Sequence, residues 1–153
     1  MTDCCTVTTG DRIPPRTAVC PRNGRTYAGV ERRTVLHHVC QPWARTLAHQ
    51  GYYFCDDADC DVVYFGEDQS LLIRGDLRVD VGQKSHGPDK TLCYCFDINA
   101  ADLQAEDAHE QARAFVIEQT RNATCDCSVR NPSGRCCLKD FPKDAQIYSS
   151  LKK

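Results

Sequence analysis

Closely spaced cysteines constrain this chain more than any other feature of its sequence. The chain has 153 residues, and twelve of them are cysteine. They include adjacent pairs, C-x-C pairs and one C-x4-C pair. Thiolates at such short spacings can reach a single metal ion together, whereas disulfides more often join distant segments. The spacing therefore predicts metal sites, and a secreted disulfide-bonded domain is the alternative.

Composition and the N-terminal sequence narrow the functional classes. Residues 1–5 contain neither the basic start nor the apolar core of a signal peptide. No apolar run approaches the roughly 18 residues of a membrane span. The formal net charge of -2 provides no broad basic surface for nucleic acid or anionic lipid. We therefore expect a cytoplasmic protein with reduced thiols, without nucleic-acid binding or membrane insertion.

Turn and loop signals divide the chain into four parts. In chain order these are a flexible leader (1–19), a β module (20–85), a helical module (90–140) and a polar tail (141–153). The leader is polar, and its adjacent prolines oppose regular structure. Residues 82–90 are rich in turn formers and predict a surface loop between the two modules.

Strands are predicted where β-branched and aromatic residues form short runs. They cover residues 27–30, 34–39, 52–55, 61–65, 70–74 and 77–81. Helices are predicted over residues 42–49 and 107–122. In the longer helix Phe115 and Val116 share the face expected in the core. Asn99 is predicted to cap a helix start, with Asp102 in the first turn. The expected fold class is α+β, a small antiparallel β module followed by a helical module.

The first candidate metal site lies in the β module. Zinc favours four nitrogen or sulfur ligands in a tetrahedron. Cys55 and Cys60 supply two of them from a C-x4-C loop, and Cys20 on a Pro/Gly turn supplies a third. A zinc knuckle of the C-P-x-C-G type would have a second cysteine at position 23, where this chain has Asn23. A site of this kind would stabilise a small sheet through its binding energy.

The fourth zinc ligand has three candidates on one predicted strand. His38 is preferred because imidazole is an ordinary zinc ligand. His37 is an alternate, but adjacent strand residues point to opposite faces, so only one of the two histidines can reach the ion. Cys40 is the other alternate, on the same predicted face as His38. The competing interpretation is that Cys55 and Cys60 are half-buried thiols without a metal.

The second candidate site begins at Cys93-Tyr94-Cys95. After a helical gap the chain supplies four more thiols, at Cys125, Cys127, Cys136 and Cys137. Two iron ions bridged by two sulfides need four thiolates, two for each iron. The tight loop 131–135 can supply backbone N–H groups to such an anionic centre. Ligand count and spacing do not distinguish this cluster from a second zinc site with four cysteines.

The sequence also resembles a known family. Cys93-Tyr94-Cys95-Phe96, the helical gap and Asn131-Pro-Ser-Gly-Arg-Cys136-Cys137 resemble the N-terminal domain of CopZ-type copper chaperones. In that family a 2Fe–2S module similar to bacterioferritin-associated ferredoxin is joined to a zinc-binding module. The resemblance also includes Tyr53-Phe54-Cys55, Cys60 to Gly66 and Val81-Gly82-x-Lys84, and it covers roughly residues 20–140.

This resemblance implies ligands for both sites. The cluster ligands fall on Cys93, Cys95, Cys127 and Cys137, with Cys136 as the alternate for the last. The zinc ligands fall on Cys20, Cys55 and Cys60, and Asn23 leaves the fourth unassigned. The implied architecture is a zinc-stabilised antiparallel β module followed by a helical 2Fe–2S-binding module.

The resemblance further implies electron transfer or a metallochaperone role in copper or heavy-metal homeostasis. Expected partners are a redox protein and a copper-transporting ATPase or another metal-handling protein. The cluster could reduce Cu(II) to Cu(I), and spare thiols, Cys4 and Cys5 among them, could hold Cu+. No nucleophile–base pair indicates an enzyme. The family's M-x-C-x-x-C copper-binding loop is missing, since Met1 is the only methionine. A redox partner without a copper role and a metal-stabilised interaction module are the alternatives.

Overall fold

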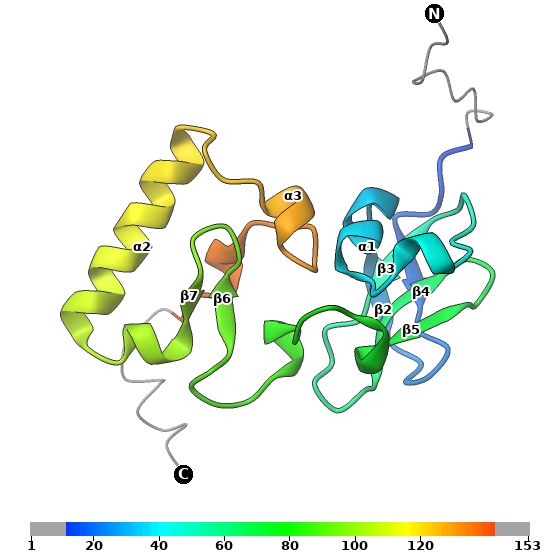
Figure 1. Ribbon diagram of the computed structural model, residues 1–153, viewed down its shortest axis with the longest axis horizontal. Helices are drawn as coiled ribbons and strands as arrows, with labels where there is room; N and C mark the ends of the chain where they lie inside the picture. The colour runs from blue at the N-terminus through cyan, green and yellow to red at the C-terminus, as the bar shows by residue number, and fades with distance from the viewer. Residues whose placement is uncertain (1–11, 143–153) are drawn as a thin grey trace, which may run out of the picture.

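The computed structural model describes residues 12–142, which form a sheet part and a helical part along the long axis (Figure 1). The sheet strands are β1 (Thr17–Val19), β2 (Thr26–Val30), β3 (Tyr52–Phe54), β4 (Val62–Gly66) and β5 (Leu71–Ile73). Helix α1 (Arg32–His38) packs on this sheet part. The helical part contains the hairpin β6 (Thr91–Cys93) and β7 (Ile98–Asn99), with α2 (Glu106–Arg121) and α3 (Cys127–Arg130). The described residues also form five short 3-10 helices: η1 (Pro42–Ala44), η2 (Arg74–Asp76), η3 (Gly82–Lys84), η4 (Ala100–Leu103) and η5 (Cys137–Lys139).

The five-stranded sheet is an antiparallel meander in the order β1-β2-β3-β4-β5. Its central strands are buried on both faces, which explains their uninterrupted apolar sequences. Tyr52 and Tyr64 join a core with Val35 of α1. The alternate residues Tyr53 and Phe65 lie in a second core, together with Cys20, Cys55 and Cys60. The sheet therefore separates a core beneath α1 from a core that contains three cysteines.

The strand predicted over residues 34–39 is wrong, because this segment forms helix α1. Thr34, Val35 and His38 are its buried residues, and their spacing places them on one face of a helix. Packing of that face outweighs the strand preference of the β-branched residues. Val39 then leaves the helix and forms an isolated bridge with Leu77.

Several other predicted boundaries change in the structure. The predicted strand 77–81 is reduced to that single bridge, and the predicted helix 42–49 is reduced to the short turn η1. Residues 17–19 of the expected leader form β1. The expected surface loop 82–90 begins with η3, in which Gly82 and Lys84 are buried. The other predicted strands, residues 27–30, 52–55, 61–65 and 70–74, correspond to β2, β3, β4 and β5.

In the helical part, the predicted cap and long helix are both present. Asn99 accepts a hydrogen bond from the Asp102 N–H, and the Asp102 carboxylate accepts one from the Asn99 N–H, at the start of η4. Val116 of α2 is 1% exposed and lies in the core, as predicted. Phe115 is 43% exposed, so its assignment to the core is wrong. It packs edge-on against Phe96 instead.

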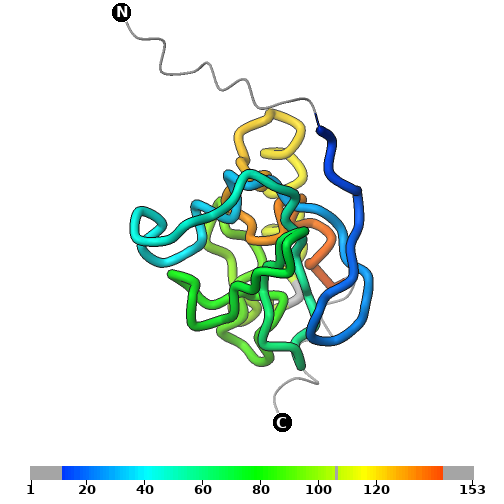
Figure 2. The backbone as a smooth tube through the Cα atoms, turned by 90° about the vertical axis from the view of Figure 1, so that its right-hand side faces the viewer, coloured from blue at the N-terminus to red at the C-terminus, as the bar shows by residue number. Residues whose placement is uncertain are grey.

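The two parts contact each other through α1 and α3. The Thr34 hydroxyl donates to the Ser128 carbonyl at 2.6 Å, and His38 Nε2 lies 2.9 Å from the Val129 carbonyl. Tyr64 donates to the Pro132 carbonyl. Figure 2 looks along the long axis with the sheet part nearest the viewer and the orange segment around α3 behind it. Within residues 12–142 no helix is long and apolar enough to span a membrane.

Candidate metal centres

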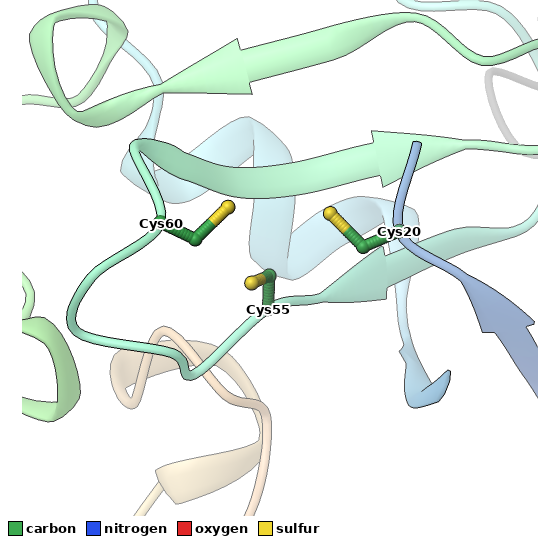
Figure 3. A group of neighbouring side chains, drawn as sticks. All are labelled: Cys20, Cys55 and Cys60. Carbon is green, nitrogen blue, oxygen red and sulfur yellow. The ribbon is translucent and has the colours of Figure 1, made fainter. Parts of the chain in front are cut away.

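Cys20, Cys55 and Cys60 form the first centre. All three are buried, and their sulfur atoms lie within 4.8 Å of one another. Figure 3 shows the three side chains pointing towards one another from the end of β1, the end of β3 and the start of β4. Among the described residues this is the one place where three such ligand atoms gather so tightly. The structure therefore brings together the three cysteines predicted from the sequence, which we call the thiol trio.

Two turns position the thiol trio. The turn after Cys20 closes with a hydrogen bond from the Gly24 N–H to the Cys20 carbonyl, at 2.9 Å. Gly24 has a φ of +73°, a conformation that glycine adopts without strain. In the C-x4-C loop the Cys60 N–H donates to the Asp57 carbonyl, and the Cys55 N–H donates to Val63 of β4. The sheet and the two turns thus fix all three sulfur atoms.

Two side-chain donors approach Cys55. Lys84 Nζ and Asn23 Nδ2 each lie 3.6 Å from its sulfur. The Asn23 amide nitrogen also contacts Tyr27 and Asp57, while its oxygen accepts from the Arg25 N–H. Asn23 therefore points its NH2 group towards the sulfur, as a donor to a thiolate rather than as a ligand. Sequence reasoning assigned no role to either side chain.

Burial keeps the Cys60 thiol protonated in the absence of a metal. Burial, and to a smaller extent the neighbouring sulfur of Cys55, raises the pKa of Cys60 to about 11. A metal ion that binds here must therefore displace a proton from Cys60. Three buried thiols are ligands that suit zinc. The two nearby side-chain N–H groups would donate hydrogen bonds to the Cys55 sulfur and would not bind the ion.

The candidates for a fourth zinc ligand do not join the thiol trio. His38 and Cys40 are outside the tight group, and His37 is exposed on α1. His38 faces α3 because its segment is a helix rather than the expected strand. Burial lowers the pKa of His38, and it stays neutral beside the Val129 carbonyl.

The second centre gathers the four cysteines that the family resemblance selects. Cys93 ends β6, Cys95 lies in the next turn, Cys127 begins α3 and Cys137 begins η5. Cys93, Cys127 and Cys137 lie in the core of the helical part, and the half-buried Cys95 packs against it. The sulfur atoms of Cys95 and Cys127 are 3.7 Å apart. The Asp126 N–H donates to the Cys95 sulfur at 3.2 Å. We call these four residues the thiol quartet.

Interactions between neighbouring thiols separate the pKa values within the quartet. The nearby Cys137 thiol lowers the pKa of Cys127 to about 5 and that of Cys93 to about 7. The same interactions raise the pKa of Cys137. Burial raises the pKa of Cys95 to about 12. The quartet therefore already contains thiols that readily become thiolates, the form that binds metal.

Cys125 and Cys136 are the other described cysteines of the helical part. Cys125 is half-buried, contacts Thr120 and also lowers the pKa of Cys127. Cys136 lines a cavity of about 380 Å³ beside Arg135 and Asp140. Cys4 and Cys5 lie outside the described residues.

Comparison with known proteins identifies the sheet part. A family model described as a zinc binding domain, zf_CopZ, matches residues 17–78. The copper chaperone CopZ of Archaeoglobus fulgidus is 38% identical over 87 residues, which are 56% of this chain and 42% of that protein. The X-ray structure of the A. fulgidus CopZ N-terminal domain matches with a TM-score of 0.63 and 32% identity, over 82% of this chain and 99% of that one.

The solved domain is covered almost completely, whereas the chain spans less than half of the full-length chaperone that it matches. The family model covers the whole sheet part, and within it all three members of the thiol trio. The chain therefore belongs to the family of the CopZ N-terminal domain and contains its zinc-binding domain.

Proposed function

We propose that this chain is a zinc and 2Fe–2S protein that transfers electrons and handles copper or a similar soft metal. The observation that carries the proposal is the thiol quartet, in which residues separated by more than thirty positions meet in one core. A 2Fe–2S cluster needs four thiolates. Cys93, Cys95, Cys127 and Cys137 supply that number from two separate segments of the chain.

Zinc at the thiol trio has a structural role in this proposal. The trio supplies three of the four ligands of a tetrahedral ion, and the fourth position is left to a water molecule or another small ligand. The ion would join the turn after β1 to the loop between β3 and β4, and its binding energy would stabilise the thin sheet. Asn23 and Lys84 would donate to the Cys55 thiolate.

Electron transfer is proposed for the thiol quartet. A bound 2Fe–2S group supplies a reversible one-electron change. The protein's own contribution is a buried setting and an N–H donor to sulfur, that of Asp126, which favour the negative charge of thiolates. Phe96 packs against this core and contacts Phe115 edge-on. A redox partner protein would deliver or accept the electron.

The copper role is inferred from the relative, which is named a copper chaperone. One electron from the cluster would convert Cu(II) to Cu(I), which thiolates bind strongly. Cys125 and Cys136 are the described thiols outside both centres that lie in the helical part, and Cys4 and Cys5 are further candidates. Metal-handling proteins such as copper ATPases would then be partners, in the cytoplasm.

A pair of cysteine substitutions tests the proposal. Cys127→Ser removes one quartet thiol, whereas the matched Cys40→Ser change removes a half-buried thiol outside both centres. We expect Cys127→Ser to lose most of the bound iron and its visible absorption, because serine is a poor iron ligand. Cys40→Ser should retain both. Equal iron contents in the two variants would contradict the assignment of the quartet.

A redox protein without a copper role is the second candidate. It is favoured by the thiol quartet itself, because a cluster held by these four thiols would transfer electrons without any copper-binding group. Cu(I) titration of the protein with its cluster, followed by addition of a copper-binding partner domain, separates the two. Stoichiometric Cu(I) binding and transfer support the chaperone role, and their absence supports the redox protein.

A further inference from the structure

The turn η3 lies in the green connection between the two parts of the molecule (Figure 1). It follows the segment 17–78 that matches the zinc-binding domain. Each of its three residues contacts a segment that carries cysteines. Lys84 contacts the thiol trio, whereas Gly82 and Gln83 contact segments of the thiol quartet.

Lys84 contacts the thiol trio. Its side chain is buried, with 1% of the residue exposed. The ammonium nitrogen lies 2.7 Å from the Asp57 carbonyl, 3.0 Å from the Cys60 carbonyl and 3.6 Å from the Cys55 sulfur. A lysine is almost never buried in this way without a compensating negative charge. The sulfur of Cys55, as a metal-bound thiolate, would add negative charge 3.6 Å from the ammonium group.

The net charge of the metal-loaded thiol trio also favours a buried cation beside it. Three thiolates around a divalent ion carry one net negative charge, which is costly in a buried site without a partner. Lys84 supplies one positive charge within the reach of Cys55. The metal-loaded trio and Lys84 are therefore neutral together.

Gln83 contacts residues on both sides of Cys137, a member of the thiol quartet. Its amide nitrogen donates to Asn131 and to Asp140, both at 3.0 Å. Asn131 is 0% exposed, and its side-chain oxygen also accepts from the Ser133 N–H. It thereby shapes the loop that leads to Cys137. The Asp140 N–H donates to the Cys137 carbonyl. Gln83 therefore binds one residue before Cys137 and one residue after it.

Gly82 contacts the first pair of quartet cysteines. Its N–H donates to the Tyr94 hydroxyl at 2.6 Å, and Tyr94 lies between Cys93 and Cys95. A side chain has no space here, because a Cβ atom would lie 1.9 Å from the Thr91 carbonyl oxygen. The turn is thus packed directly against β6.

We propose that η3 couples the two centres, with Lys84 and Gln83 as its positioning residues. Metal at the thiol trio fixes Lys84, and the same short turn then holds Asn131 and Asp140 in place around Cys137. Zinc binding consequently strengthens cluster binding, and cluster binding strengthens zinc binding by the same factor. We expect the stronger cluster binding to slow the release of iron. This inference rests on the proposed function, since it requires a metal at the trio and a cluster at the quartet.

The experiment uses the full chain with Lys84→Met, Gln83→Leu and the control Lys90→Met, six residues after Lys84. Zinc affinity is measured by competition with a chelator. Iron release is followed by visible absorption, with and without zinc. Lys84→Met should weaken zinc binding by about 10–100-fold, the usual effect of removing an outer partner of a metal ligand. Lys90→Met should leave zinc affinity unchanged. Gln83→Leu should make iron release faster and independent of zinc.

Equal zinc affinities of Lys84→Met and Lys90→Met would overturn the role of Lys84. A wild-type iron-release rate that does not change with zinc would overturn the coupling. If Lys84→Met does not fold, Lys84→Arg keeps the buried cation, and Gln83→Leu still decides the coupling. Iron-free wild-type protein would instead refute the proposed cluster, and the zinc affinities would then test the role of Lys84 alone.

Discussion

At the scale of single residues, the cysteines of the thiol quartet differ in the pKa of their thiols. The neighbouring Cys137 thiol lowers the pKa of Cys127 to about 5, whereas burial raises the pKa of Cys95 to about 12. Their sulfur atoms are nevertheless 3.7 Å apart. The identity and number of cysteines could be read from the sequence, but these pKa differences depend on contacts between distant segments.

His38 gives a pH prediction at this scale. Burial lowers its pKa below the ordinary 6.5, and the charge of Arg78 lowers it further. At a pH between the lowered pKa of the folded chain and the ordinary pKa of the unfolded chain, His38 binds a proton in the unfolded chain but not in the folded one. Acidification therefore favours unfolding. The stabilisation present above pH 6.5 should therefore be lost as the pH falls through the folded pKa.

Urea unfolding between pH 7.5 and 5 tests this prediction. His38→Gln should flatten the pH dependence, because glutamine has no charged form and can still donate to the Val129 carbonyl. His49→Gln, the matched change at an exposed histidine, should keep the wild-type dependence. Metal loss in acid affects all three proteins, so the difference between the variants isolates His38. Identical pH profiles of the two variants would be inconsistent with a buried neutral His38.

At the scale of elements, strands β2 to β5 and the long helix α2 were predictable, whereas α1, the short strands β1, β6 and β7 and the connecting segments were not. The apolar runs of β3 and β4 and the amphipathic pattern of α2 are local properties. Helix α1 was mistaken for a strand because its β-branched residues favour strands locally, whereas its burial on the sheet and its contact with α3 favour a helix. This error also misplaced His38 as a zinc ligand.

The packing of η3 on β6 gives a prediction for this scale. Gly82→Ala places a methyl group against the Thr91 carbonyl oxygen, 1.9 Å away. The two segments must move apart, and we expect the free energy of unfolding to fall by about 1–3 kcal/mol, as in other overpacked sites. The Gly82 hydrogen bond to Tyr94 should weaken as well.

Gly75→Ala is the matched control, because a Cβ at Gly75 meets no atom within 4 Å. Thermal and urea unfolding of both variants, with metals bound, provides the measurement. Gly75→Ala should unfold close to the wild type. A Gly82→Ala protein as stable as Gly75→Ala would show that η3 does not pack tightly on β6.

At the scale of the whole molecule, two cysteine centres share one folded body. The thiol trio lies on the face of the sheet opposite α1, and the quartet lies in the helical part. The membership of the trio followed from its C-x4-C and Pro/Gly signals. The role of Lys84 did not, because a buried lysine has no local signature and its partners lie more than twenty residues away in the sequence.

Metal and sulfide analysis of the anaerobically purified chain, with its visible spectrum before and after dithionite, tests the central claim most directly. The account predicts about two iron, two sulfide and one zinc for each chain, and visible absorption that dithionite bleaches. A colourless, iron-free protein with zinc bound at both centres would contradict it.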